Sequence, residues 1–227
     1  MILIPAHNEE EAIQDVLEAV RQYAPKEEIV VVDSCCTDDT ANIAKNFGAT
    51  VIQASQKGYW NALTTGYSYA LDKDTEYLIQ LDGDGQHPAA AIPRLRHQLK
   101  QTEKTEKVDW VVGSRQNTGS YLPLERRFAQ KIFSRVVEWK TGQYLGDISS
   151  GFWALNQRAL RVLLDYPYQN GDVLIRVYGL QKGLNIKEIS APMQERKSGQ
   201  SMHSRLTAGL YVVRLIQEWQ HLNKQSV

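Results

Sequence analysis

The sequence predicts an α/β protein whose mostly parallel sheet carries helices on both faces. Short apolar runs alternate with longer amphipathic segments along the first half of the chain, as they do in βαβ units. Polar residues stand directly after several of these apolar runs, and open parallel sheets bind their ligands beyond those strand ends. The 227 residues are enough for one large domain with a substantial core.

Each expected element follows from a local pattern. Asn8 can cap a first helix, because glutamates favour its first turn and apolar residues recur at helical spacing over 12–20. A second helix should begin at Thr37 or Asp38 and close at Gly48, a common C-cap residue. The expected strands are 2–4, 29–32, 50–52, 77–81, 108–112, part of 149–155, and 186–189. The further expected helices are 59–71, 88–100, 124–141, 172–182 and 206–222.

Composition excludes several classes of protein. Lysine plus arginine balances aspartate plus glutamate at 26 each, whereas a general nucleic-acid binder would usually be basic. The two cysteines, Cys35 and Cys36, are adjacent, which excludes a disulfide framework and favours a reducing, cytoplasmic setting. The first residues lack the features of a signal peptide, and no stretch reaches the ~18 apolar residues of a membrane span. We therefore expect a cytoplasmic protein that binds no nucleic acid.

The most informative segment is the acidic loop 82–87 after the expected strand 77–81. Asp82 and Asp84 would repel each other unless a cation or protons lay between them. Their hard oxygen ligands, with the amide oxygen of Gln86, suit Mg²⁺ or Mn²⁺ shared with substrate phosphates. Gly83 and Gly85 allow a tight turn close to a ligand. The sequence thus predicts a metal site at Asp82, Asp84 and Gln86.

Simpler interpretations compete with this one. An EF-hand loop needs glutamate at its twelfth position, and counting from Asp82 gives Pro93, so that class is excluded. A solvated turn stays open, since Asp-Gly is a common turn signal. His87 beside the turn is interpreted as a structural side chain. A nucleotidyltransferase or a dinucleotide-binding dehydrogenase would need a glycine-rich loop near the N-terminus, and this chain has none there.

Polar motifs elsewhere in the chain stand in a fixed order around the acidic loop. They are Ile4-Pro5-Ala6-His7-Asn8-Glu9-Glu10, Asp33-Ser34-Cys35-Cys36-Thr37-Asp38-Asp39-Thr40, Lys57-Gly58, Gly113-Ser114-Arg115, Ser150-Gly151-Phe152 and Glu195-Arg196-Lys197-Ser198-Gly199-Gln200-Ser201. In this order, with the acidic loop, they resemble glycosyltransferase family 2, the inverting GT-A group. The resemblance extends to about Ser201 and is greatest to the dolichyl- and polyprenyl-phosphate sugar transferases.

The resemblance implies a Rossmann-like GT-A fold and an inverting, metal-dependent transfer of sugar from a nucleoside-diphosphate sugar. One domain would span 1–227, with a nucleotide-sugar-binding half at 1–115, an acceptor-side half at 116–205 and a C-terminal helix at 206–227. The residues that it places on the nucleotide sugar are Pro5, Ala6, His7, Asn8, Glu9, Asp33, Lys57, Asp82, Gly83 and Arg196. It places Asp84 and Arg115 in catalysis, and Asp147 and Asp172 are added to them as candidate general bases.

The acceptor stays open between a polyprenyl phosphate and a hydroxyl of a glycan or small molecule. A hydroxyl needs a general base, for which Asp147 and Asp172 are the candidates, whereas a phosphate is already anionic. A basic cluster at Arg126, Arg127, Lys131 and Arg135 could face an anionic acceptor, a membrane headgroup or only solvent. A membrane-surface contact and a homo-oligomer through the last helix are both left open.

Three departures from the family pattern distinguish this chain. Ser34, Cys35 and Cys36 follow Asp33 where Asp-Gly-Ser is usual, and Tyr59-Trp60 replaces smaller residues. Trp153 stands where arginine often follows Ser-Gly-Phe, and it could stack on a sugar ring instead of binding a phosphate. The alternative from another functional class is therefore a relative that binds a nucleotide sugar without catalysis.

Overall fold

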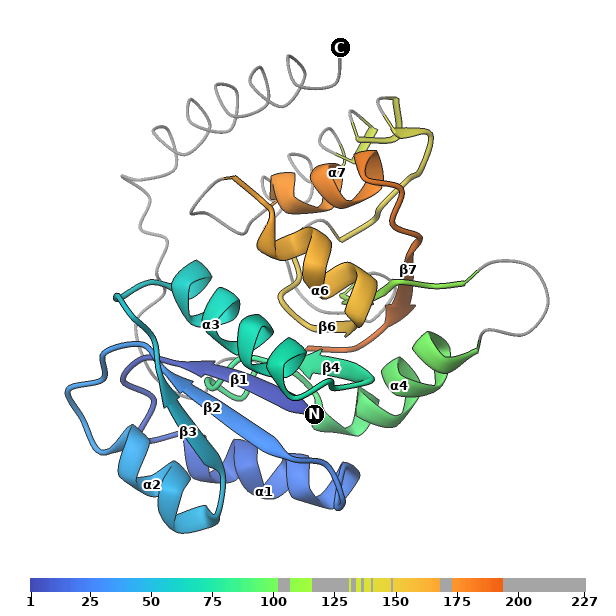
Figure 1. The fold of residues 1–227 in the computed structure, drawn as a ribbon. Coiled ribbons are helices and arrows are strands. Elements are labelled where there is room, and N and C mark those ends of the chain that lie inside the picture. The colour runs from blue at the N-terminus through green and yellow to red at the C-terminus, as the bar shows by residue number, and fades with distance from the viewer. Residues whose placement is uncertain are drawn as a thin grey trace.

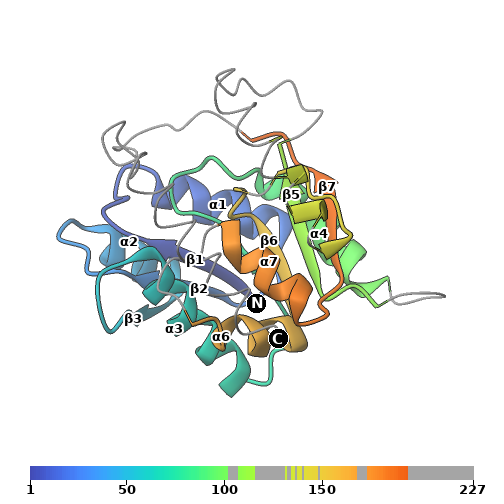
Figure 2. The ribbon, with the colours of Figure 1, turned by 90° about the horizontal axis from the view of Figure 1, so that it is seen from above.

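The structure is a computed structural model, and it describes 1–101, 107–115, 131, 134–135, 137–139, 141–147, 149–167 and 173–193. Within these described residues, seven strands form one sheet in the order β3-β2-β1-β4-β6-β5-β7. The strands are β1 (Ile2–Ala6), β2 (Ile29–Asp33), β3 (Thr50–Gln53), β4 (Tyr77–Gln80), β5 (Trp110–Ser114), β6 (Trp153–Asn156) and β7 (Ile186–Ser190). Figure 2 shows β3 at one end of the sheet and the pair β5 and β7 at the other.

The sheet is parallel except at one strand. β1 pairs in parallel with β2 and β4, β2 with β3, and β5 with β7. β6 runs antiparallel to both of its neighbours, β4 and β5, which therefore run parallel to each other. The expectation of a mostly parallel sheet is confirmed. It follows that β1, β2, β4 and β5 all end at the same edge of the sheet.

Helices cover both faces of the sheet (Figure 1). They are α1 (Ile13–Tyr23), α2 (Thr40–Phe47), α3 (Tyr59–Asp72), the 3-10 helix η1 (Ala89–Ala91), α4 (Ile92–Lys100), α6 (Gln157–Leu164) and α7 (Val173–Gln181). One apolar core joins α1, α2 and α4 to Ile2 and Ile4 of β1, and the other joins α3, α6 and α7 to Leu3. Successive side chains of a strand point to opposite faces of the sheet, so a single strand contributes side chains to both apolar cores.

The helix starts differ from those expected. α1 begins at Ile13, not directly after Asn8, whose positive φ of 55° places it in a loop. α2 begins at Thr40 instead of Thr37 or Asp38, although it does close at Gly48 in the left-handed conformation. In both places polar side chains bond to another loop before the helix begins, so the residues with the strongest capping propensity serve a tertiary contact.

The sequence interpretation missed α6. Asn156 caps this helix by accepting a hydrogen bond from the backbone N–H of Ala159, and Leu160 and Leu163 are buried. The helix has only eight residues, and its cap was the signal that could have found it. The expected helix at 172–182 is present as α7, and the described residues between 131 and 141 are helical. The expected helix at 206–222 lies outside the described residues.

Among the described residues, no helix combines the length and apolar character needed to span a bilayer.

α3 lies unusually close to the central strand β1, and Gly66 makes this approach possible. A Cβ atom added at Gly66 would stand 2.3 Å from Leu3 Cδ1 and 3.0 Å from Leu3 Cγ. Leu3 is fully buried, so its side chain has little room to move away. A methyl group at position 66 would therefore overpack this core.

Replacing Gly66 with alanine should destabilise the protein by about 1–3 kcal/mol, because overpacking outweighs the ~1 kcal/mol gain in helix propensity. The free energy of unfolding in urea measures this. Combining Gly66→Ala with Leu3→Ala should cost less than the sum of the two single changes, since the new methyl fills part of the vacated space. Additive losses would contradict the proposed contact.

Candidate active site

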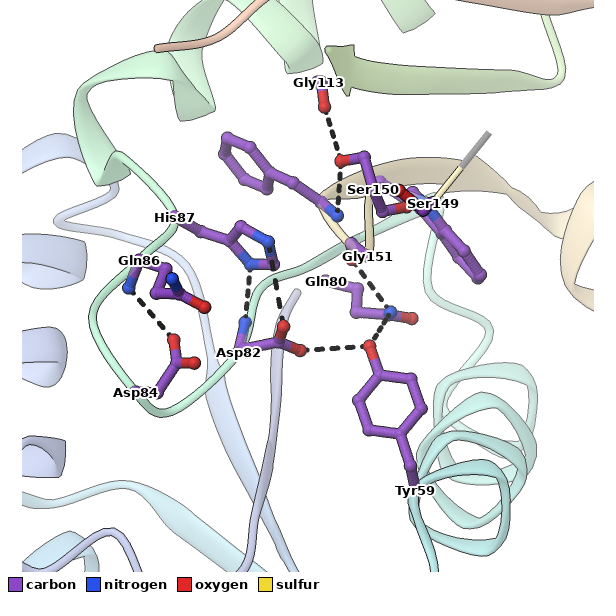
Figure 3. A network of polar contacts seen from close by, with 12 residues as sticks. Tyr59, Gln80, Asp82, Asp84, Gln86, His87, Gly113, Ser149, Ser150 and Gly151 are labelled. Carbon is purple, nitrogen blue, oxygen red and sulfur yellow. Dashed lines mark hydrogen bonds and ion pairs between the residues drawn. The ribbon is translucent and has the colours of Figure 1, made fainter. Parts of the chain in front are cut away.

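The acidic loop leaves β4 directly beside the chain that enters β6. Gln80 pairs with Trp153 in antiparallel register, which places Gly151 next to Asp82. A Cβ atom at Gly151 would lie 2.8 Å from the Tyr59 hydroxyl and 3.5 Å from Asp82 Oδ2. The start of α3, the end of β4 and the turn before β6 therefore meet at the Asp82 carboxylate (Figure 3).

Each carboxylate of the acidic loop has its own partners. The Tyr59 hydroxyl donates to Asp82 Oδ1 at 3.0 Å, and the side chain of Asp82 is 30% exposed. Asp84 is buried, and its Oδ1 accepts from the backbone N–H of Gln86 at 3.0 Å. Figure 3 shows Asp82 pointing toward Tyr59 and Asp84 toward the Gln86 backbone. The two acids therefore lie in one loop but do not point at each other.

His87 fixes the backbone where β4 becomes the acidic loop. Its Nδ1 accepts from the backbone N–H of Asp82 at 2.9 Å, so in the neutral ring the proton is on Nε2. That nitrogen lies 3.7 Å from Asp82 Oδ2, and the ring stacks on Phe152 with 5.2 Å between centroids. His87 thus ties the acidic loop to the Ser150–Trp153 segment, which no local sequence signal indicated.

The loops after β1 and β2 are held together by side chains. Asn8 Oδ1 accepts from the backbone N–H of Thr37 at 2.8 Å, and Thr40 Oγ1 accepts from that of Glu9 at 2.9 Å. Asp38 accepts from the backbone N–H of Glu10 at 3.1 Å. His7 Nδ1 lies 2.8 Å from the carbonyl oxygen of Ser34. Two of the segments predicted to meet the nucleoside thus form one wall at the sheet edge.

Asp33, the last residue of β2, orders the loop that follows this strand. Its two oxygens accept from the backbone N–H of Cys36 at 2.7 Å and from Gln53 Nε2 at 2.6 Å, and the residue is buried. Burial alone would raise the pKa of Asp33, but these hydrogen bonds hold it below the ordinary value. Asp33 is therefore a carboxylate that orders its own loop. Its contact with a base or ribose stays a prediction.

The acidic loop lies against the wall formed by the loops after β1 and β2. A Cβ at Gly83 would be 3.5 Å from Ala6 Cβ and 3.6 Å from Glu9 Cγ, so the chain after β4 touches the end of β1. Pro5 is buried within β1, where it pairs with Val32, and Lys57 is exposed just before α3. The structure thus gathers the predicted residues after β1, β2 and β4 at one edge of the sheet.

Arg115 and Asp147 form a buried ion pair beside this edge. Arg115 donates from its backbone N–H, Nε and Nη2 to the Asp147 carboxylate at 2.7–2.9 Å. Glu188 of β7 accepts from the backbone N–H groups of Gly146 and Asp147. Burial alone would raise the pKa of Asp147, but the hydrogen bonds and charge of Arg115 lower it. Fully buried and paired, Asp147 is poorly placed to act as a general base.

Trp153 is a core side chain. It is 2% exposed, its indole N–H donates to the Ser150 carbonyl, and its ring packs on Trp110 with 4.7 Å between centroids. Arg176 of α7 is equally buried, stacks on Trp153 and also donates to the Ser150 carbonyl. The suggestion that Trp153 stacks on a sugar is therefore wrong, because its ring does not reach the surface.

Several predicted residues lie outside the described part of the chain. They are Asp172, Arg196, Lys197, Arg126 and Arg127. Of the basic cluster, Lys131 and Arg135 are described and exposed, and Arg135 pairs with Glu138 at 2.7 Å. That pairing is compatible with a solvated helix face.

The oxygens available at the loop fit a divalent cation bound together with phosphates. Among the described residues, no three histidine, cysteine or acidic side chains converge to form a complete metal cage. Mg²⁺ is usually held by one or two carboxylates and completed by substrate phosphates, as the acidic loop would allow. A metal site at this loop stays a prediction, in which Asp84 and Asp82 would supply carboxylates and Gln86 an amide oxygen.

Comparison with known proteins agrees with this geometry. The family model for glycosyl transferase family 2 matches residues 1–164, and the chain belongs to this family. An undecaprenyl-phosphate mannosyltransferase of Micrococcus luteus is 27% identical over 94% of this chain and 90% of its own length. A dolichyl-phosphate hexose transferase of Haloferax volcanii is 26% identical over 86% of this chain and 82% of its own. The protein is a glycosyltransferase that resembles the polyprenyl-phosphate sugar transferases.

A solved structure supports the fold independently. Glucosyl-3-phosphoglycerate synthase from Mycobacterium tuberculosis, in complex with Mn²⁺, UDP and glucosyl-3-phosphoglycerate, superposes with a TM-score of 0.69. The match has 20% sequence identity and covers 88% of this chain and 72% of that one. The GT-A fold expected from the sequence is thereby confirmed.

The Arg115–Asp147 pair yields a prediction about stability and pH. Asp147→Asn should destabilise the protein by about 3 kcal/mol near pH 7, because it leaves the mostly buried Arg115 without its charge partner. The lowered pKa means that the charged carboxylate stabilises the fold above its unfolded pKa of ~3.9. This contribution is lost as the pH falls through the folded pKa.

Urea unfolding of the protein and of Asp147→Asn should therefore show a difference in unfolding free energy that shrinks below about pH 4. A difference that stayed constant from pH 7 to the acid limit of folding would contradict the ion-pair account.

Proposed function

We propose that this protein is an inverting, metal-dependent glycosyltransferase that moves a sugar from a nucleoside-diphosphate sugar to a polyprenyl phosphate. The observation that carries the proposal is the position of the acidic loop. Gly83 lies against Ala6 and Glu9, so Asp82 and Asp84 border the wall formed by the loops after β1 and β2. A nucleoside on that wall would place its diphosphate at the acidic loop.

The residues of the loop would work by holding and neutralising the donor. Asp84, Asp82 and Gln86 would hold Mg²⁺ or Mn²⁺, which when bound would offset the negative charge of the departing diphosphate. Fixed polar groups at this position stabilise charge that develops in the transition state. Attack at the anomeric carbon from the face opposite the diphosphate gives inversion.

The Arg115–Asp147 pair argues against one of the two candidate bases, Asp147, that a hydroxyl acceptor would need. A hydroxyl acceptor needs a base to take its proton, but Asp147 is fully buried and carries a lowered pKa. A phosphate oxygen is anionic and needs no such base. The relatives from Micrococcus luteus and Haloferax volcanii are named for lipid-phosphate acceptors, which supports the same assignment. This acceptor would bring the protein to a membrane surface, and its cytoplasmic location remains a prediction.

Cation-dependent nucleotide binding tests the donor site. UDP or GDP should raise the thermal unfolding temperature only when Mn²⁺ is present, since a ligand that binds the native state stabilises it. Asp84→Ala should abolish this shift and the sugar transfer, while its unfolding temperature without ligand stays near that of the unchanged protein. Full turnover by Asp84→Ala would refute the site.

Asp72→Ala provides a control, because Asp72 is the exposed last residue of α3 and is no part of the predicted metal set. Binding of nucleotide sugars by the unchanged protein without any transfer or hydrolysis would instead favour the non-catalytic alternative.

A comparison of two acceptors tests the lipid-phosphate assignment. With sugars of whichever nucleoside diphosphate gives the thermal shift, undecaprenyl phosphate should accept sugar and undecaprenol should not, because only the phosphate presents an anionic oxygen. Radiolabelled sugar in the lipid fraction measures the transfer. Transfer to undecaprenol at a comparable rate would overturn the assignment and would require a base.

A further inference from the structure

Four residues join the buried core to the acidic loop through consecutive hydrogen bonds. The Tyr67 hydroxyl lies 2.5 Å from Gln80 Oε1, Gln80 Nε2 lies 3.1 Å from the Tyr59 hydroxyl, and that hydroxyl lies 3.0 Å from Asp82 Oδ1. Tyr67 and Gln80 are fully buried. Figure 3 shows the Tyr59 hydroxyl between the Asp82 carboxylate and the Gln80 amide.

The direction of every bond in this chain follows from one carbonyl group. Gln80 Nε2 also lies 3.0 Å from the carbonyl oxygen of Gly151, which can only accept. The amide nitrogen must therefore face Gly151 and Tyr59, and the amide oxygen must face Tyr67. Tyr67 then donates to Gln80, Gln80 donates to Tyr59, and Tyr59 is left to donate to Asp82.

Backbone contacts fix the position of Tyr59 itself. It is the first residue of α3, and the backbone N–H of Gly58 before it donates to Ser34 Oγ at 3.0 Å. Trp60 after it is buried and packs edge-on against Tyr67 and Tyr166. Gly151 closes the other side, since even a Cβ atom there would stand 2.8 Å from the Tyr59 hydroxyl. The hydroxyl has little freedom to point elsewhere.

We propose that Tyr59 is a positioning residue, which holds the Asp82 carboxylate ready for the cation and diphosphate through the relay Tyr67–Gln80–Tyr59. This proposal rests on the proposed function. The relay aligns its donors toward one anionic group, and hydrogen bonds in such a chain strengthen one another. A carboxylate that binds a metal is ordinarily held by a hydrogen bond of this kind.

Mn²⁺ binding tests the relay directly. Free Mn²⁺ is measured by its electron paramagnetic resonance signal in titrations with UDP or GDP present, using whichever nucleotide the unchanged protein binds. Tyr59→Phe removes only one oxygen and should weaken Mn²⁺ binding about 10-fold to 100-fold, the usual loss for such a partner. Tyr67→Phe should cause a smaller loss, because it frees the Gln80 amide to turn.

The matched control is Tyr69→Phe, because Tyr69 lies on the same helix and its hydroxyl contacts Glu28 away from the acidic loop. This variant should bind Mn²⁺ as the unchanged protein does. Without ligand, Tyr59→Phe and Tyr69→Phe should unfold at nearly the temperature of the unchanged protein, which separates positioning from loss of folding. Tyr67→Phe should unfold at a lower temperature, because it leaves the buried Gln80 Oε1 without a donor, and Mn²⁺ binding is therefore measured where all variants are folded.

A double-mutant cycle separates action through Asp82 from a general structural role. In the Asp82→Asn background, adding Tyr59→Phe should cause no further loss of Mn²⁺ affinity, because the carboxylate that Tyr59 positions is gone. An equal loss in both backgrounds would overturn the proposal. If Asp82→Asn leaves no measurable Mn²⁺ binding, the Tyr67→Phe variant tests the relay instead. A Mn²⁺ affinity of Tyr67→Phe equal to that of the unchanged protein would overturn the relay.

The outcomes also separate this inference from the proposed function. If the unchanged protein shows no nucleotide-dependent Mn²⁺ binding, both are overturned. If it binds Mn²⁺ with nucleotide and Tyr59→Phe binds equally well, only the role of Tyr59 is overturned and the acidic loop keeps its assignment.

Discussion

The candidate site depends on the antiparallel pairing of β4 with β6, the strand that breaks the parallel order of the sheet. This pairing sets Gln80 opposite Trp153, and it therefore brings Gly151 beside Asp82 where the acidic loop begins. A one-residue slip would turn the side chains of the strand to the opposite faces of the sheet. Burial on both faces makes such a slip costly, because β4 feeds both apolar cores. The packing of β4 in the two apolar cores thus fixes the position of the acidic loop that carries Asp82 and Asp84.

The buried polar groups around the acidic loop cost little free energy because hydrogen-bond and charge partners satisfy them. Gln80 is fully buried, yet its amide bonds to Tyr67, Tyr59 and Gly151. Asp147 is fully buried, yet it meets Arg115 in several hydrogen bonds. Burying such groups unpaired would cost several kcal/mol each by order of magnitude. A network that is satisfied in this way holds a single geometry, which a site that binds a charged ligand requires.

Much of the fold could be predicted from the sequence because its signals are local. The apolar runs gave the strands, and the polar residues after them gave the edge where ligands should bind. The capping residues were less reliable, since Asn8 bonds across to the other loop, and Asp38 bonds both to that loop and to the backbone N–H of Thr40, where α2 begins. The eight residues of α6 carry too little periodicity to predict a helix, and the capping residue Asn156 is its one local signal.

The candidate site could be predicted only where its residues are adjacent in the chain. The acidic loop was visible because Asp82, Asp84 and Gln86 lie within five positions. The partners of Asp82 were not visible, because Tyr59 and Gly151 reach it only through the packing of α3 and the register of β6. A glutamine within the apolar run before Asp82 was a signal, since a buried amide needs partners. The burial of Trp153 likewise depends on contacts with Arg176 and Trp110 that no local pattern encodes.

The central claim is that the acidic loop binds a divalent cation together with a diphosphate. Crystals soaked with Mn²⁺ and the nucleoside diphosphate that the protein binds would test it through anomalous scattering at the manganese edge. The account predicts one strong peak between the acidic loop and the two phosphates, within bonding distance of a carboxylate oxygen of Asp84. A peak remote from Asp84, or a diphosphate bound away from the loops after β1 and β2, would contradict it.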